Sequence, residues 1–361
     1  MASISLSKSE KSYIQAGLLS TPPTRADGRS LTDYRAVALE TGTIPLANGS
    51  ARVSIGANPH DGSGGTVVLA GVKLEVVDIG VGSRSDEGVQ RDGGLNCTVN
   101  CSPAAYPHLS QNALDELQYD LTTLISTTLS HRTLHPANLI IVENKKAWQV
   151  HLDLVVFADA GNVYDALFMA SRAALWDTKV PRTRGVGYKA PASTSASSSL
   201  AKGKKSMIGA DEDVEMKDQE QISGLDTRTI VHPATDFELP DYWDEGEPLD
   251  GQDKWPVCVT LNIPSSTVHF LDATLPEDAA VPFKLLVMFA FSDPSKGKGS
   301  DTQSSAVIQG VRTLGIGEMS KEQFANLIKS AEIHARELWA ALNLRLREEA
   351  TNRERKGKYK E

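Results

Sequence analysis

The sequence has 361 residues, of which 40% are hydrophobic and 23% are charged, and its net charge is −9. This length exceeds what one core usually absorbs, so we expect two core units with connecting segments. No apolar run approaches the roughly 20 residues of a membrane span, and the N-terminus lacks the apolar core of a signal peptide. The three cysteines, an odd and sparse set, favour free thiols in a reducing compartment such as the cytosol or nucleus.

The acidity of the chain is concentrated in one segment. Residues 211–253 contain fifteen Asp or Glu and two Lys or Arg, a local balance of −13, which leaves +4 for the rest of the chain. The folded body is therefore expected to be mildly basic. A polyanionic partner such as RNA is compatible with that charge, whatever the overall acidity.

A short helix is expected near the N-terminus. Ser7 and Glu10 have the spacing of a capping box, and apolar side chains recur on one side of residues 7–18. The segment TPPTRADGRS then predicts extended chain and a turn, because proline does not fit a helix interior and Asp-Gly favours a turn. From 49 to 101, three stretches rich in Val, Ile, Leu and Thr predict strands.

The middle of the chain predicts a helix and then a strand, a turn and a second helix. Leucines at three- and four-residue spacing predict a helix at about 111–131. NLIIVE and WQVHLDLVVF predict strands, and VYDALFMASRAALWD predicts a helix. Alanines on one side of this last helix would allow it to lie close against a sheet.

Strand patterns return after residue 255, in WPVCVTLNI, TVHFLDA, FKLLVMFAF and SAVIQGVRTL. A capping box at Ser320 and Gln323 and one apolar stripe predict a final helix at 320–347. Each half thus has strands first and then a long helix. The expected fold class is α+β, with two units of related plan.

The segment between the halves differs in composition. Residues 182–229 are rich in Ser and charge and poor in apolar residues, so they cannot bury enough surface to offset the entropy of ordering, and we expect disorder. The acidic stretch DFELPDYWDEGEPLDGQDKWP that follows contains aromatic residues, so we expect parts of it to pack on the body.

Three carboxylates surround the turn in LDLVVFADAGNVYDALFMASRAAL: Asp153, Asp159 and Asp165. Acids at a strand end can serve as metal ligands or general acids. A structural interpretation is favoured about nine to one, since turn Asp residues far outnumber catalytic ones. Asp153 would pair with a neighbour at a strand end, Asp159 would start the turn, and Asp165 would complement the helix dipole.

The order of several short motifs resembles the RNase PH family. They are SEKSYIQAG, RADGRSLTDYR, GSARVSIG, VLAGVKLEV, the segment HLDLVVFADAGNVYDALFMASRAAL, KVPRTR and HFLDATLPED. More narrowly, the chain is similar to the non-catalytic ring subunits of the RNA exosome. The resemblance implies an RNase PH-like fold of two β-α-β-type halves, each with a mixed sheet packed by helices, in a hexameric ring around an RNA channel.

The resemblance also implies domain boundaries. Residues 1–24 would form an N-terminal helix and extended arm, and 25–184 the RNase PH-like first half. Residues 185–254 would be an acidic, largely disordered insert, 255–347 the second half, and 348–361 a charged C-terminal tail.

Active relatives carry two acids and a phosphate-binding arginine around the turn at 159–162. Aligned with that pattern, these positions hold Val155, Ala160 and Tyr164. Phosphorolysis needs a cation to hold phosphate and an acid near the leaving oxygen, so the resemblance implies no catalytic residues and no enzymatic activity here. A one-residue shift would place Asp159 on the catalytic acid, but it would break the match of Gly161.

RNA contacts are suggested by the resemblance at a few arginines. The family's channel loop corresponds to VDIGVGSRSDEGVQRDGG, where Arg84 and Arg91 stand among acids. Two RNA-binding arginines of archaeal relatives fall on Ser126 and Leu129, although Arg132 lies close by. An ordinary solvated loop is at least as good an interpretation of Arg84 and Arg91. The basic tail after 345 could contact RNA, contact a partner or simply be solvated.

Metal and cofactor sites are not expected. His131 and His135 have the spacing of a helical metal pair, but Pro136 disfavours helix there and no further ligand is near. Cys97 and Cys101 share one strand face without two more ligands, so core packing is the better interpretation. The sequence DGSGG lacks the Lys-Ser/Thr of a P-loop.

The function expected from the resemblance is that of a structural ring subunit of the exosome that forms part of the RNA channel for 3′–5′ processing and decay, including rRNA maturation. The implied partners are other RNase PH-like ring subunits, cap subunits and RNA, with no membrane, in nucleus, nucleolus and cytoplasm. Two alternatives stay open: an active phosphate-dependent exoribonuclease, and a protein-docking adaptor that uses the insert and tail. The apolar strands TVVLAGVKLEVV and FKLLVMFAF predict open sheet edges for partners, unless both are central.

The insert gives the first testable prediction. Deleting residues 190–225 should leave the melting temperature nearly unchanged, because this stretch has no apolar periodicity with which to join a core. Limited proteolysis of the full chain should cut within the same stretch first. A large fall in melting temperature on deletion would show that the segment is part of the folded body.

Overall fold

A computed structural model describes residues 6–57, 64–79, 94–143, 145–186, 236–239, 246–291 and 305–358. Of the predicted insert, residues 185–186, 236–239 and 246–254 are described, and the rest lies outside these ranges. Arg84 and Arg91 also lie outside the described residues.

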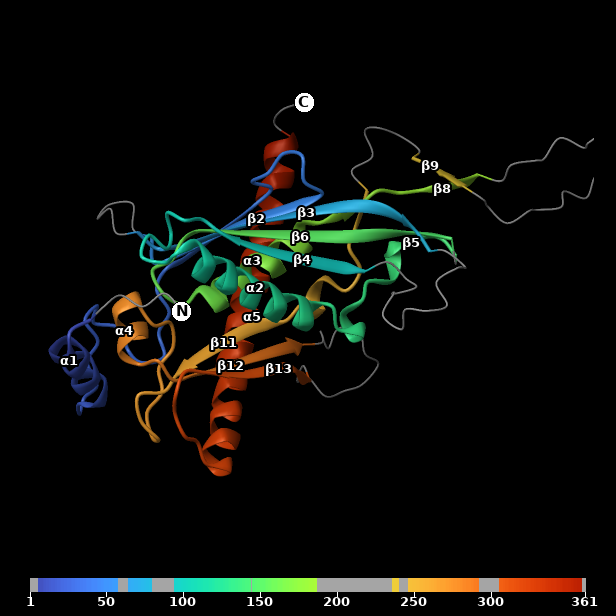
Figure 1. Ribbon diagram of the computed structural model, residues 1–361. Helices are drawn as coiled ribbons and strands as arrows, with labels where there is room; N and C mark the ends of the chain where they lie inside the picture. The colour runs from blue at the N-terminus through green and yellow to red at the C-terminus, as the bar shows by residue number, and fades with distance from the viewer. Residues whose placement is uncertain are drawn as a thin grey trace, which may run out of the picture.

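The first half of the chain forms a six-stranded sheet (Figure 1). The strand order is β1-β2-β3-β6-β4, with β5 paired to β6, and all pairs are antiparallel except β4 with β6. The strands are β1 (Val37–Thr41), β2 (Gly49–Ile55), β3 (Thr66–Asp78), β4 (Leu95–Cys101), β5 (Ile140–Val142) and β6 (Lys146–Ala158).

The second half forms a smaller antiparallel sheet of three strands, in the order β11-β12-β13. These are β11 (Val257–Asn262), β12 (Lys284–Phe291) and β13 (Ala306–Leu314). Short paired segments near the ends of the insert are β7 (Lys179–Val180), β8 (Arg184–Val186), β9 (Asp236–Glu238) and β10 (Glu247–Pro248). Residues 184–186 pair with 236–238, so the prediction of disorder from residue 182 was wrong at this segment. The acidic stretch after 236 pairs with the body through β10 and β7, as its aromatic content led us to expect.

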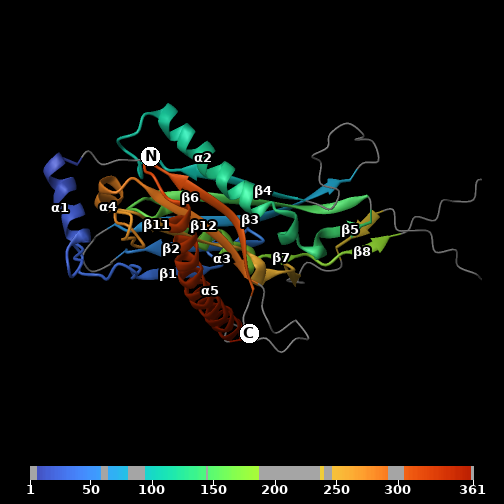
Figure 2. The same cartoon turned by 90° about the horizontal axis from the view of Figure 1, so that it is seen from below.

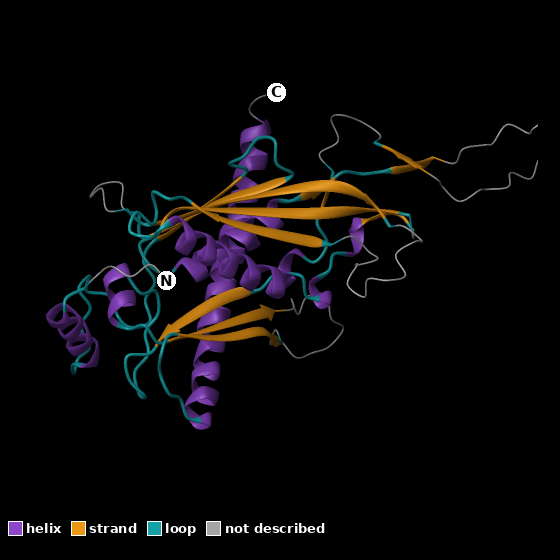
Figure 3. Ribbon diagram, in the orientation of Figure 1, coloured by secondary structure: helices purple, strands orange, loops and turns teal. Residues whose placement is uncertain are grey.

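Helices fill the space between the two sheets (Figures 1 and 3). Helix α2 (Gln111–Leu129) packs on β4, and α3 (Val163–Asp177) contacts β2 and β3 on one side and β11 on the other. Residues 163 to 175 of α3 are all buried, including the small side chains Ala166, Ala170 and Ala173. The predicted close approach of this helix to a sheet is thus confirmed, and α3 belongs to the core of both halves.

The remaining helices lie at the periphery or along the second sheet. Helix α1 (Lys8–Leu19) begins at the predicted capping box and packs on α4 (Leu275–Ala280). Short 3₁₀ turns are η1 (Arg132–Leu134), η2 (Ala137–Leu139) and η3 (Gln252–Lys254). Within the described residues, no helix is long and apolar enough to cross a membrane.

Helix α5 (Lys321–Lys358) is 38 residues long and runs past both sheets (Figure 1). Its start at the Ser320–Gln323 capping box was predicted, but its end at 347 and a separate tail from 348 were wrong. Ion pairs of two kinds stabilise the turns of α5 beyond residue 347. Arg345 pairs with acids one turn ahead, and Arg353 pairs with Asp177 at the end of α3.

Three further expectations differ from the structure. The segment TVHFLDA is not a strand, because it makes only one isolated bridge, from Phe270 to Asn262. The strand β1 and the helix α4 were not predicted. Both β3 and β12 are central strands, so the prediction that they form open edges is wrong.

One buried carboxylate joins the two halves. Asp272 has no exposed side-chain surface, and its oxygens accept hydrogen bonds from Arg29 at 2.8 Å, from Arg35 at 2.8 and 2.9 Å and from Asn162 at 3.0 Å. Burial opposes the ionisation of Asp272, but the hydrogen bonds and the positive charge of Arg35 outweigh it and hold its pKa below the ordinary value. Nearby, Arg25 makes a buried ion pair with Glu277 at 2.7 Å.

Removing the charge at this junction should destabilise the protein. In Asp272→Asn the amide keeps the size and tolerates the positive φ of 46°, yet it removes the buried anion that Arg29 and Arg35 share and leaves Arg29 with Asp27 alone. We expect a loss of about 3–5 kcal/mol of unfolding free energy, measured by urea denaturation.

The control for this substitution is Asp27→Asn. Asp27 also accepts a hydrogen bond from Arg29, at 2.7 Å, but its side chain is 34% exposed. The expected loss is below about 1 kcal/mol. Equal losses in the two variants would contradict the role assigned to Asp272.

Candidate functional site

The turn between β6 and α3 places the candidate site at a helix N-terminus. The Asp159 carboxylate accepts a hydrogen bond from Gly161 N–H at 2.8 Å, which confirms that Asp159 starts the turn. Gly161 has φ +98°, and a Cβ there would lie 2.3 Å from the Ala273 carbonyl oxygen. Asn162 follows in the left-handed region at φ 61°. The turn thus lies directly against the second half of the chain.

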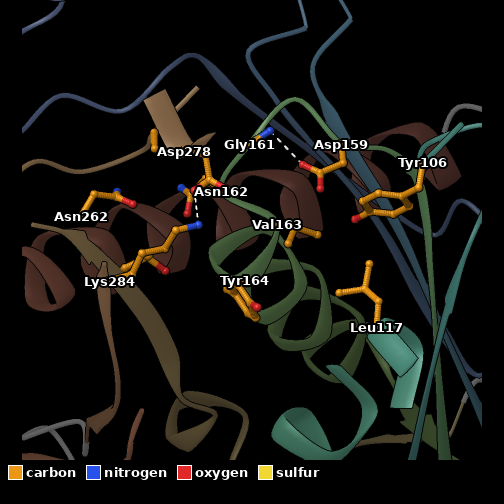
Figure 4. Close-up of a pocket in the computed structure, with 12 residues that line it drawn as sticks. Tyr106, Leu117, Asp159, Gly161, Asn162, Val163, Tyr164, Asn262, Asp278 and Lys284 are labelled. Carbon is orange, nitrogen blue, oxygen red and sulfur yellow. Dashed lines mark hydrogen bonds and ion pairs between the residues drawn. The ribbon is translucent and has the colours of Figure 1, made fainter. Parts of the chain in front are cut away.

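A small pocket opens beside this turn (Figure 4). Residues from both halves line it, and those used below are Tyr106, Asp159, Asn162, Tyr164, Asn262, Asp278 and Lys284. Its volume is about 30 Å³, which holds about one water molecule.

The charges in the pocket do not favour an anion. Lys284 is buried and ion-paired with Asp278, so its positive charge is already balanced. Asp159 adds a second carboxyl group, and burial raises its pKa above the ordinary value although the Gly161 N–H opposes this. The N-terminus of α3 alone would attract an anion, but these carboxyl groups counteract it.

Several buried polar atoms around the pocket lack a hydrogen-bond partner among the described residues. They are the side-chain oxygens of Tyr106, Asn162 and Asn262. Groups of this kind suit an ordered water molecule, in keeping with the pocket volume. The pocket can therefore hold water in a polar setting, and it offers no unpaired cation from its lining for phosphate chemistry.

The three positions aligned with the active family behave differently. Tyr164 lines the pocket and is buried, so a side chain at this position does reach the site. Ala160 contributes main-chain contacts: its N–H donates to Thr66 and its carbonyl accepts from Leu275 N–H at 3.0 Å. Val155 lies within β6 and does not line the pocket.

The other two acids of the motif also differ from expectation. Asp153 was expected to pair at a strand end, but it is exposed within β6 and makes no ion pair among the described residues. Asp165 does lie in the first turn of α3. Its side chain is fully buried, however, and accepts hydrogen bonds from Thr260 at 2.7 Å and from Tyr34 at 3.0 Å. Asp165 is therefore an interior link between the two halves.

The candidate RNA and metal residues lie away from this pocket. Arg132 is exposed on η1, just after α2, whereas Leu129 is part of the core. His131 and His135 flank η1 outside α2, and no three potential metal ligands come together in the described parts of the chain. Cys97 and Cys101 are buried, as core packing requires, and burial raises the pKa of each thiol to about 12.

Comparison with known proteins gives the family of the first half. The RNase PH family (3′ exoribonuclease family, domain 1) matches residues 33–181, which include the turn, α3 and the whole six-stranded sheet. The chain carries an RNase PH domain. The recognition made from the motifs is thus confirmed.

Similar curated proteins bear exosome names. Over 158 residues the chain is 36% identical to the exosome complex component Rrp42 of Saccharolobus islandicus, covering 44% of this chain and 52% of that protein. It is 30% identical over 225 residues to the putative exosome complex exonuclease RRP42 of Dictyostelium discoideum, covering 50% and 66%. The chain spans about half the length of the archaeal relatives that it matches.

Solved structures agree in fold over most of the chain. One is the Archaeoglobus fulgidus exosome with RNA bound to the active site, at TM-score 0.56 and 20% identity, covering 91% of this chain and 96% of that one. Another is an archaeal exosome core, at TM-score 0.56 and 19% identity, covering 92% and 96%. The α+β, RNase PH-like fold class is therefore confirmed.

The buried Asp165 gives a pH-dependent prediction. Burial raises its pKa from 3.8 to about 6, despite hydrogen bonds that lower it. The folded state therefore holds this proton more tightly than the unfolded state, and stability is lost as the pH rises from about 4 through about 6. That rise corresponds to about 3 kcal/mol.

Asp165→Asn removes the titration. The unfolding free energy of the wild type minus that of the variant should fall between pH 4 and 6 and stay constant above, as measured by urea denaturation at each pH. Asp153→Asn, at an exposed carboxyl of the same segment, serves as the control. A flat difference for Asp165→Asn would show that this carboxyl is not desolvated.

Proposed function

We propose that this protein is a ring subunit of an RNA exosome and has no active site of its own. The observation that carries the proposal is the pocket at the N-terminus of α3. Its lysine is paired with Asp278, and Tyr164 occupies the position aligned with the phosphate-binding arginine. Phosphorolysis needs a free cation to hold the attacking phosphate.

The similar proteins support the assembly part of the proposal. The archaeal relatives are named exosome components, and the shared fold covers about nine-tenths of this chain and 96% of each of two chains from exosome structures. The proposed partners are other RNase PH-like ring subunits, cap subunits and RNA in the central channel, for processing and decay that include rRNA maturation. The proposed locations are nucleus, nucleolus and cytoplasm.

Direct RNA contact is proposed at a few arginines only. Arg132 is exposed beside the end of α2 and is available to a phosphate backbone. Arg84 and Arg91 stay candidates from the sequence. Leu129 is buried in the core, so this position does not contribute to such a surface.

An active phosphate-dependent exoribonuclease is the second candidate. The name of the Dictyostelium relative, a putative exonuclease, favours it. Asp159 would then be the catalytic acid, because it is the acid of the turn that lines the pocket. A docking adaptor that uses the insert would be compatible with either function.

Incubation with RNA separates the first two candidates. The isolated chain, mixed with single-stranded RNA, phosphate and Mg²⁺, should release no nucleoside diphosphate above background. Co-expression with RNase PH-like ring chains should give a defined heteromer in sedimentation, with phosphorolysis that Asp159→Asn leaves unchanged. Steady release by the isolated wild type that is abolished in Asp159→Asn would identify it as an enzyme.

A further inference from the structure

A larger cavity, of about 390 Å³, opens between strand β1 and helix α5, away from the turn at 159–162. Figure 2 shows α5 passing beside β1, and the two elements are in contact. Most of its walls are apolar: Val37 and Leu39 come from β1, Leu271 from the second half, and Leu338, Ala341 and Leu342 from α5. We call this cavity the β1–α5 groove.

Strand β1, whose Val37 and Leu39 line this groove, also has unpaired main-chain groups along its outer edge. Gly56 N–H donates to the Ala36 carbonyl at 2.8 Å, and Gly42 N–H donates to the Ser50 carbonyl at 2.8 Å. Hydrogen-bonded positions alternate in an antiparallel pair, so the N–H and C=O of Val37 and Leu39 point away from β2. No hydrogen bond within the described residues engages those groups.

At the opposite edge of the same sheet, on β4, side chains satisfy main-chain groups that point outward. On β4, Val99 N–H donates to Thr122 Oγ1 at 3.0 Å, and Cys101 N–H donates to Gln118 Oε1 at 3.0 Å. The Leu95 carbonyl accepts from Ser130 at 3.1 Å. Side chains in and just after α2 thus close the β4 edge, whereas the outward groups of Val37 and Leu39 on β1 have no such cover among the described residues.

We propose that the β1–α5 groove binds an extended segment of a partner protein. The segment would pair its main chain with Val37 and Leu39 and place apolar side chains, two residues apart, against Leu338, Ala341 and Leu342. Main-chain pairing supplies affinity, and alternate side chains in the groove supply specificity. Because β1 has five residues, the paired segment is short.

The geometry favours this occupant over a helix or a small apolar molecule. Either of those could fill the cavity, but neither would satisfy the outward main-chain groups of β1. The rim of the groove is polar: Glu337, with its side chain 74% exposed, lies 3.7 Å from His334, and Arg345 lines the groove as well. The inference does not depend on the function proposed above, because no RNase PH chemistry enters it.

The probe is a random nonapeptide library displayed on phage and selected against the immobilised full chain. Enriched peptides should carry apolar residues two positions apart. Ala341→Arg fills the groove from an exposed position and should weaken the best peptide at least ten-fold. The matched control is Ala340→Arg, at the neighbouring exposed residue that does not line the groove. The affinity of this variant for the best peptide should stay within two-fold of the wild-type affinity.

Hydrogen exchange identifies the binding mode. The best peptide should slow the exchange of the Val37 and Leu39 amides, which a helix in the groove would leave unchanged. The inference is overturned by a failure to enrich any peptide, by apolar spacing of three or four residues, or by unprotected β1 amides. Self-association of the chain that Ala341→Arg abolishes would also overturn it, since a second copy would then be the occupant.

Discussion

The architecture depends on one buried negative charge shared by segments far apart in the chain. Asp272 binds Arg29 and Arg35 from the segment before β1 and Asn162 from the turn before α3. A carboxylate in the interior is stable only when its oxygens are saturated by charged or polar donors. The three donor side chains must therefore surround Asp272 together in the folded state. This requirement sets how the second half packs against the first. The motifs RADGRSLTDYR and HFLDATLPED provide this ion-pair junction.

The candidate site inherits its shape from that junction. Gly161 lies so close to the Ala273 carbonyl that no side chain fits, and Leu275 N–H donates to the Ala160 carbonyl. With the turn pressed against the second half, the remaining pocket is small, and Lys284 lines it already paired with Asp278. The same contacts that stabilise the interface between halves thus decide what the pocket can hold.

Local features of the structure were readable from the sequence, whereas distant contacts were not. The capping boxes at Ser7 and Ser320 fixed two helix starts, and the turn at Asp159 followed from short-range chemistry. Lys284 and Asn262 carry no sequence signal for the site, because the fold alone brings β11 and β12 to α3. Strand β1 was missed since VALET is short and weakly patterned. TVHFLDA was misassigned because Phe270 packs in a separate small cluster with Leu18 and Val281 and not in a sheet. The end of α5 depends on Arg353 finding Asp177, a partner 176 residues away.

The open β1 edge and the closed β4 edge of the large sheet limit how copies of the chain can associate through it. Open-ended stacking of sheets, as in fibrils, needs every unit to accept a strand on one side and offer one on the other. Here Gln118, Thr122 and Ser130 close the β4 side, so this sheet can be extended only from β1. Two copies can pair at their β1 edges, but no open edge of this sheet is then left for a third copy. Edge-to-edge pairing through this sheet therefore stops once two copies have joined. The exposed β1 strand is thus compatible with a protein kept at high local concentration.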